Sequence, residues 1–147
     1  MTIREMSIVD YNSLVPFWKA NYFVGEMDNK DRFKLFLKKN INLSLLAEEN
    51  GKIVGTALGS FDGRRGYIQK VVVAKVYRKK GLGQQLVKEV IERLRALGAT
   101  YIPICVEEKN VHFYENCGFK KTKQVPMNIF IKAKLKSHIS IISGKTS

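Results

Sequence analysis

Apolar residues recur along this chain at two different spacings, and each spacing predicts a different kind of element. Residues 46 to 56 form two apolar runs around Asn50-Gly51, a dipeptide that favours a type I′ turn, so they predict a β-hairpin. In residues 84 to 97 apolar side chains follow a spacing of three and four, which predicts an amphipathic helix that Gly98 ends. Residues 101 to 106 are mostly apolar and predict a buried strand.

A basic turn with two glycines stands between a valine-rich run and the predicted long helix. The first N–H groups of a helix lack intrahelical partners and carry the positive end of its dipole, so they attract anions. Arg78, Lys79 and Lys80 add positive charge to this turn, and Gly81 and Gly83 allow close backbone approach. The segment therefore predicts a phosphate or pyrophosphate site, although an ordinary strand-to-helix turn would also use glycines.

Two well-known phosphate motifs do not fit this turn. A Walker A loop needs Lys and Ser or Thr after its last glycine, whereas Gln84 and Gln85 follow Gly83. The dinucleotide fingerprint needs a third glycine, and Leu86 occupies that position. What remains is the pattern Arg-x-x-Gly-x-Gly after a valine-rich strand.

A second pattern follows the predicted strand at 101 to 106. It consists of Asn110, then Phe113-Tyr114, then Gly118-Phe119. The two patterns, in this order and separated by one helix and one strand, resemble the GNAT superfamily of acetyl-CoA-dependent N-acetyltransferases. The resemblance extends to residues 3 to 11 and 46 to 56, which look like the first three strands and the first helix of the family. Residues 66 to 68 resemble a prokaryotic GNAT branch with mostly unassigned substrates, and residues 109 to 114 resemble the glucosamine-phosphate N-acetyltransferases.

This resemblance implies an α/β (α+β) GNAT fold. About four helices would flank a mixed, mostly antiparallel sheet of six to seven strands, and the fourth and fifth strands would splay to open a slot for the coenzyme. Residues 1 to 132 would form the single domain. Residues 133 to 147 would form a basic C-terminal tail, and whether it is flexible or adds a strand to a neighbouring molecule stays open.

The resemblance also implies which residues hold acetyl-CoA. The N–H groups of the turn would face the pyrophosphate, the valine strand would offer main-chain groups to the pantetheine arm, and an N–H near its end would stabilise the developing oxyanion. The implied coenzyme-binding residues are Val71, Val72, Val73, Arg78, Lys79, Lys80, Gly81, Leu82, Gly83, Gln84, Asn110 and Phe113. No metal is expected.

Tyr114 matches the family position of the general acid. A phenol is protonated at neutral pH and can donate to the departing thiolate. The alternatives are that Tyr114 is a core residue of a short helix, and that Asn110 caps that helix. The general base is not identified: the strand position that is acidic in many relatives holds Cys105, and Glu26, Asp62, Glu107, His112 or a water relay stay open.

Three substrate positions depart from the glucosamine-phosphate enzymes. Those enzymes carry Glu-Asp where this chain has Gln69-Lys70, and an arginine where it has Phe130. The departures remove anionic groups for an amino sugar and a bidentate phosphate ligand. The sequence therefore argues against glucosamine 6-phosphate as the acceptor.

The chain has 26 Lys and Arg against 13 Asp and Glu, a net charge of +13 over 147 residues. An anionic small-molecule amine suits this charge, and so does an acidic peptide. The alternatives are a protein N-terminal or lysine acetyltransferase, or a coenzyme-A-binding module without turnover. Nucleic acid is not expected as a partner, because the lysines are spread along the chain.

Other compositional signals concern location and assembly. No run of 18 apolar residues and no basic-then-apolar leader is present, so neither a membrane nor export is expected. Cys105 and Cys117 lack metal-site or disulfide spacing, which favours a reducing cytoplasm. Homodimer formation is left open.

Overall fold

The computed structural model describes residues 1–132, and its centre is an antiparallel sheet. The strands lie in the order β1 (Thr2–Glu5), β2 (Leu45–Glu49), β3 (Lys52–Phe61) and β4 (Gly66–Val73). The predicted hairpin is confirmed as β2 and β3. Asn50 and Gly51 both have positive φ, 52° and 77°, as a type I′ turn requires. A second turn, closed by the Asp62 N–H bound to the Arg65 carbonyl, joins β3 to β4.

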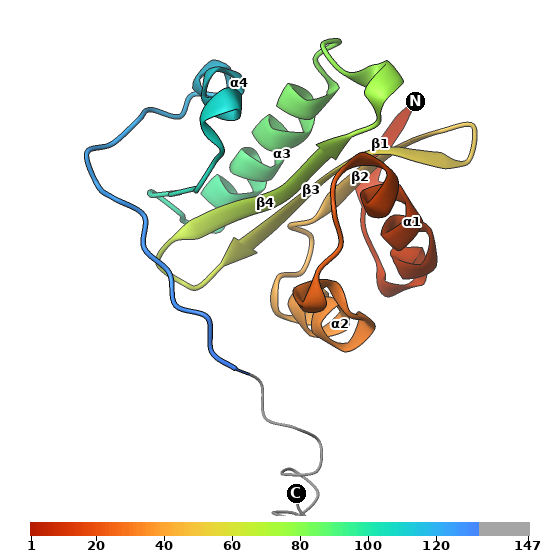
Figure 1. Ribbon diagram of the computed structural model, residues 1–147, viewed down its shortest axis with the longest axis horizontal. Coiled ribbons are helices and arrows are strands. Elements are labelled where there is room, and N and C mark those ends of the chain that lie inside the picture. The colour runs from red at the N-terminus through yellow and green to blue at the C-terminus, as the bar shows by residue number, and fades with distance from the viewer. Residues whose placement is uncertain (133–147) are drawn as a thin grey trace, which may run out of the picture.

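Helices cover both faces of this sheet (Figure 1). α3 (Leu82–Ala96) packs on one face, and α1 (Tyr11–Asn21) and α2 (Lys30–Lys39) lie on the other. α4 (Val111–Asn116) follows α3, and the 3-10 turns are η1 (Ile8–Asp10), η2 (Glu26–Asp28), η3 (Lys75–Tyr77) and η4 (Glu108–Asn110). Within residues 1–132, no helix is long and apolar enough to cross a membrane.

The predicted amphipathic helix is confirmed as α3, beginning two residues earlier than its apolar spacing indicates. Its buried side chains are Leu82, Leu86, Val87, Val90 and Leu94. A Cβ at Gly59 of β3 would lie 2.6 Å from Val90 Cγ1 and 2.7 Å from the Leu43 carbonyl oxygen. The missing side chain therefore lets α3 approach the sheet closely.

The number of strands differs from the prediction. The described residues form four strands, not six to seven, and residues 101 to 106 are not a strand. One backbone hydrogen bond, from the Gly66 N–H to the Tyr101 carbonyl (3.0 Å), ties this segment to β4. Pro103 lacks an N–H group, which removes a ladder donor from its middle.

Residues 119 to 132 run along the outside of the body without helix or strand (Figure 1). Residues 125 to 131, here called the apolar arm, expose Val125, Met127, Ile129, Phe130 and Ile131 by 79–92%. The expected basic tail, residues 133 to 147, lies outside the described residues.

The ladder between β3 and β4 is interrupted by a β-bulge. Thr56 pairs with Val72 but Leu58 pairs with Gln69, so Lys70 and Val71 stand opposite a single residue of β3. Lys70 has φ 51°, in the left-handed region. Buried Thr56 fixes the bulge from inside: its hydroxyl donates to the Lys70 carbonyl (2.9 Å) and accepts from Trp18 Nε1 (3.1 Å).

Candidate active site

The turn between β4 and α3 leaves several N–H groups available. Lys79 and Gly81 have left-handed φ values of 61° and 86°, which reverse the chain just before α3 begins at Leu82. Among the residues that the structure describes, the N–H groups of residues 79 to 84 donate no hydrogen bond to a loop carbonyl or a side chain. With the dipole of α3 behind them, these groups form a cradle for an anion.

The two glycines of this turn have different physical roles. A Cβ at Gly81 would meet no atom within 4 Å, so its left-handed φ is the reason for glycine there. A Cβ at Gly83 would lie 3.1 Å from Phe113 Cζ and 3.3 Å from Val73 Cγ2. Gly83 is therefore needed to pack α3 against α4, whether or not a ligand binds at its N–H group.

A second contact joins the same two helices. Gln84 Nε2 donates to the Asn116 carbonyl at 2.6 Å, from the first turn of α3 to the last residue of α4. The Gln84 side chain is thus engaged within the protein, and only its main chain remains for a ligand. The contacts of Gly83 and Gln84 fix α4, and with it Tyr114, beside the anion cradle.

The three cations predicted at the turn are not equivalent. Arg78 Nε donates to the Val73 carbonyl (2.9 Å) and its Nη2 to the Asn21 carbonyl (3.3 Å), so this side chain links the ends of β4 and α1. Lys79 and Lys80 are exposed. They are the cations of this turn that remain directed to solvent.

The three valines predicted to bind coenzyme also differ in their surroundings. Val72 is 4% exposed and pairs with Thr56, so it belongs to the core. The Ala74 N–H bonds to the Val54 carbonyl (2.9 Å), and main-chain direction alternates along a strand, so the Val73 N–H points away from β3 toward the free edge. Val71 lies in the bulge.

Tyr114 is half-buried on α4, between two aromatic neighbours. Its ring stands perpendicular to those of Phe113 (4.9 Å) and Phe119 (5.8 Å). Burial, with smaller contributions from nearby Cys117, Tyr22 and Tyr67, raises the pKa of Tyr114 to about 12. Its hydroxyl is therefore protonated at physiological pH.

Asn110 ends η4 directly before α4. Its side chain is exposed and makes no capping hydrogen bond to α4. The alternative role as a helix cap is not observed, which leaves the amide available to a ligand.

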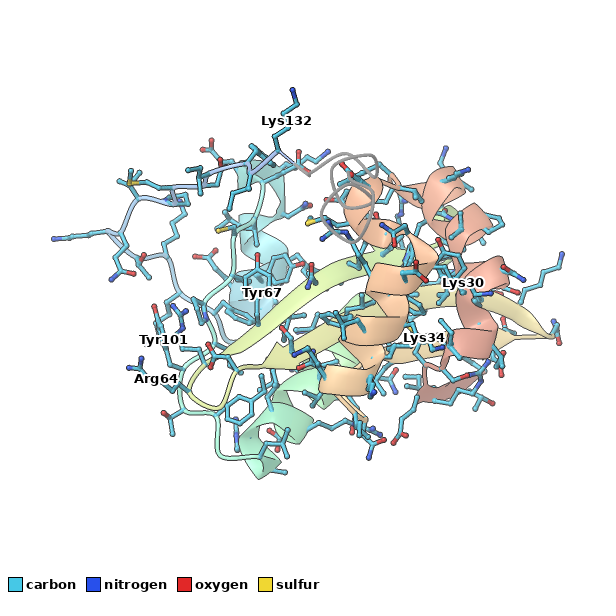
Figure 2. The ribbon with its side chains drawn as sticks, turned by 90° about the horizontal axis from the view of Figure 1, so that it is seen from below. Lys30, Lys34, Arg64, Tyr67, Tyr101 and Lys132 are labelled. Carbon is cyan, nitrogen blue, oxygen red and sulfur yellow. The ribbon has the colours of Figure 1, made fainter. Side chains whose placement is uncertain are left out.

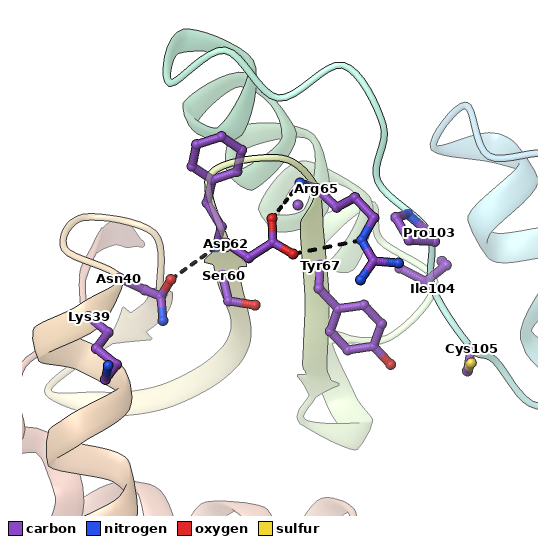
Figure 3. Close-up of a pocket in the computed structure, with 11 residues that line it drawn as sticks. Lys39, Asn40, Ser60, Asp62, Arg65, Tyr67, Pro103, Ile104 and Cys105 are labelled. Atoms are coloured by element: carbon purple, nitrogen blue, oxygen red, sulfur yellow. Dashed lines mark hydrogen bonds and ion pairs between the residues drawn. The ribbon is translucent and has the colours of Figure 1, made fainter. Parts of the chain in front are cut away.

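A pocket of about 740 Å³ opens at the β3–β4 turn (Figure 3). It lies between the end of α2, the β3–β4 turn and the segment at 103 to 105, and its wall includes Lys39, Asp62, Arg65, Tyr67, Ile104 and Cys105. Tyr67 (Figure 2) is also among the groups that raise the pKa of Tyr114. Among the described residues Tyr67 therefore relates this pocket to Tyr114, while α4 and the β4–α3 turn contribute no residue to the wall.

The structure does not favour any of the four candidate general bases. Of the four, Asp62 alone lines this pocket, and its Oδ1 accepts from the Arg64 and Arg65 N–H groups at 2.7 and 2.6 Å. These bonds hold the pKa of Asp62 below its usual value, which weakens it as a base. The side chain of His112 is 86% exposed, and Glu26 and Glu107 are also exposed.

Sequence reasoning missed the residues that surround Lys70. Its ammonium lies 3.0 Å from Asp28 Oδ2, so its charge is paired within the protein. Asp28 is far from Lys70 in sequence, and no motif marks it. The sequence pointed weakly to Tyr67 as a site residue, since it lies in the segment that resembles one GNAT branch. Nothing in the sequence pointed to Tyr22.

Comparison with known families decides the assignment. Residues 11–119 match the family model described as the acetyltransferase (GNAT) family. The chain belongs to this family. It is accordingly a GNAT-type N-acetyltransferase, and the family uses acetyl-CoA as its acetyl donor.

Solved structures agree in fold. A glucosamine-6-phosphate N-acetyltransferase from Arabidopsis thaliana is 21% identical, covering 89% of this chain and 98% of that chain, with a TM-score of 0.73. A GNAT family acetyltransferase from Streptococcus pneumoniae is 24% identical, covering 90% and 98%, with a TM-score of 0.72. A Mycobacterium tuberculosis protein in complex with CoA is 18% identical, covering 87% and 76%, with a TM-score of 0.67. At these identities the likeness concerns the fold.

We expect substitution of Gly81 by valine to weaken acetyl-CoA binding more than tenfold, because a β-branched residue disfavours the left-handed φ that shapes the anion cradle. Gly63→Val is the matched control, since Gly63 also has positive φ (94°) and open space around it but lies in the distant β3–β4 turn. Calorimetric titration checks both variants. Equal affinities for Gly81→Val and Gly63→Val would contradict the assignment of this turn.

Proposed function

We propose that this enzyme transfers the acetyl group of acetyl-CoA to the primary amine of a small molecule that also carries an anionic group. The supporting observation is the pocket at the β3–β4 turn, whose wall residue Tyr67 is a neighbour of Tyr114. Its volume of about 740 Å³ is in the range of small-molecule sites. Its wall contributes two cations, Lys39 and Arg65, and one carboxylate, Asp62, which is 3.7 Å from Arg65. The excess of positive charge favours an anionic acceptor.

In this proposal the turn and β4 hold the coenzyme. The N–H groups of residues 79 to 84 receive the pyrophosphate, and exposed Lys79 and Lys80 neutralise it. The free edge of β4 pairs with the amide-rich pantetheine arm, with the Val73 N–H directed toward it. The amide of Asn110 adds a hydrogen bond from the side of α4.

Tyr114 acts on the departing sulfur. A thiol has a pKa of about 8.5, so full proton transfer from a phenol whose pKa is about 12 would be uphill by about 5 kcal/mol. We therefore assign Tyr114 the role of hydrogen-bond donor to the sulfur as negative charge develops. The acceptor nitrogen loses one proton, and the CoA thiolate gains one, so the reaction balances. Water in the open pocket relays the proton, because no described carboxylate is suited to be the base.

Tyr114→Phe should lower turnover about 10²-fold and leave coenzyme affinity unchanged, since one hydroxyl is lost and the ring packing stays. The raised pKa of Tyr114 keeps its hydroxyl protonated well above neutral pH. The pH–rate profiles of wild type and variant should therefore have the same shape from about pH 6 to about pH 10. Steady-state kinetics and calorimetry check this. Normal turnover in the variant, or loss of an alkaline limb that wild type shows, would contradict the assignment.

The acceptor class is tested with matched amines. Aminoalkyl phosphates should be acetylated with higher kcat/KM than the corresponding aminoalcohols, and Lys39→Gln should reduce this preference. Lysine-bearing peptides in the same thiol-release assay test the protein-acceptor alternative. Uniform rates across the charged and neutral pairs would rule out an anionic acceptor.

Glucosamine 6-phosphate should be a poor member of this panel. Gln69 and Lys70 replace the Glu-Asp pair of the enzymes that use this sugar, and Phe130 replaces their arginine; it is 90% exposed on the apolar arm. Each lost charge-assisted contact costs about 1.5–3 kcal/mol. A catalytic efficiency above roughly 10⁴ M⁻¹s⁻¹ for this sugar would overturn the expectation.

We also propose that the chain forms a homodimer through the apolar arm. In an extended chain Val125, Met127, Ile129 and Ile131 share one side and Phe130 lies on the other, and all five are exposed. A second copy of the arm offers the same apolar side chains and would cover them.

Ile129→Asp should convert the dimer to a monomer in sedimentation equilibrium, because a charge would be buried in the shared face. Val9→Asp is the matched control, since Val9 and Ile129 are both 83% exposed and Val9 lies on η1. A wild-type chain that stays monomeric at high micromolar concentration would refute the dimer.

A further inference from the structure

Lys70 combines a strained backbone with a buried charge. It occupies the left-handed position of the β4 bulge, with φ 51°, where a non-glycine residue is uncommon. Its side chain is only 9% exposed, although lysine normally extends into solvent. The chain thus keeps a long cation at a position that glycine would suit better.

The ammonium of Lys70 is fully engaged by one neighbouring segment. It donates to the Phe23 carbonyl at 2.7 Å and lies 3.0 Å from Asp28 Oδ2. It also lies 5.1, 5.3 and 4.5 Å from the ring centroids of Trp18, Tyr22 and Phe23, here called the ring cage. These distances are within the range of cation–π attraction.

Asp28 connects this contact to the rest of residues 22 to 28. Its Oδ2 accepts from the Gly25 N–H at 2.8 Å, and its carbonyl accepts from the Tyr11 hydroxyl at 2.7 Å. Tyr22 and Phe23 are themselves about half exposed, so they bury little apolar surface of their own. The lysine is the strongest tie between this segment and β4.

One residue of this segment, Tyr22, lies toward the candidate active site. Arg78 of the turn donates to the carbonyl of the preceding Asn21 at 3.3 Å, and Tyr22 is among the groups that raise the pKa of Tyr114. The Lys70 carbonyl is held by Thr56, so the bulge cannot shift without disturbing the core. The position of residues 22 to 28 relative to Tyr114 therefore depends on where the Lys70 ammonium is held.

We propose that Lys70 is a positioning residue whose ammonium holds residues 22 to 28 against β4 and thereby places Tyr22 beside Tyr114, where the acceptor amine must arrive. By filling the ring cage, the ammonium also keeps the protonated amine of an acceptor out of it. The acceptor amine is thereby directed to the neutral space beside Tyr114. The kinetic part of this inference rests on the proposed function, whereas the binding part does not.

Two variants separate the charge from the hydrocarbon stem. Lys70→Ala removes three methylenes and the ammonium, and Lys70→Met keeps most of the stem without the charge. Both retain a Cβ, so both carry the same backbone strain at φ 51°. Lys34→Ala, an exposed lysine on α2 (Figure 2), is the control for loss of one positive charge.

The first measurement needs no turnover. Trp18 is the only tryptophan of the chain, so its fluorescence reports directly on the ring cage. Without coenzyme, Lys70→Ala should shift the emission and lower Tm. n-Propylammonium, which matches the deleted atoms, should restore both in a saturable manner at millimolar concentration, whereas n-propanol should not. Failure of n-propylammonium to restore either signal would overturn the cage assignment.

The second measurement uses the best amine of the panel. Lys70→Met and Lys70→Ala should raise the acceptor KM at least about tenfold and leave coenzyme affinity within about twofold. Lys34→Ala should match wild type in both. Wild-type acceptor KM in both Lys70 variants would overturn the positioning role. If wild type acetylates no amine, the proposed function is wrong. The fluorescence experiment then still tests whether the Lys70 ammonium occupies the ring cage.

Discussion

The β-bulge at Lys70 and Val71 is the constraint on which the rest of the site depends. It is held from inside by one buried chain of hydrogen bonds, from Trp18 through the Thr56 hydroxyl to the Lys70 carbonyl. An unpaired polar group at this depth would be costly, so the three groups are linked in a single arrangement. Beyond the bulge, the Val73 N–H faces the open edge of β4, and at the bulge the Lys70 side chain reaches Phe23 and Asp28. One interruption of the ladder thus bears on both contacts.

The contact between α3 and α4 couples coenzyme binding to catalysis. Gly83 and Gln84 belong to the turn that would receive pyrophosphate, and the same two residues hold α4 through Phe113 and Asn116. A six-residue helix has little stability by itself. Tyr114 therefore owes its position to α3, and in the proposed function this aligns its hydroxyl with the thioester held by the turn.

Strong local signals in the sequence were sufficient for the hairpin and for α3, because a type I′ dipeptide and about four turns of amphipathic spacing leave few alternatives. Residues 101 to 106 show the opposite case: their apolar composition predicted a strand, but Pro103 and the single hydrogen bond to β4 leave them outside the ladder. The motif predicted a basic turn at the start of a helix, but it did not predict which contacts its individual side chains make. Arg78 bonds to two carbonyls of its own chain, and Asp28 meets Lys70 across 42 positions of sequence, contacts that no local pattern encodes.

The Arg78 side chain has a consequence for the order in which substrates add. It joins the carbonyl of Val73, at the end of the coenzyme strand, to that of Asn21, which immediately precedes the acceptor-side segment. In the proposed function, coenzyme bound at the turn would order Arg78, and Arg78 would order the start of residues 22 to 28. The conformational entropy of this segment would then be lost before the amine binds. Such a linkage favours a sequential mechanism in which acetyl-CoA binds first and the amine second.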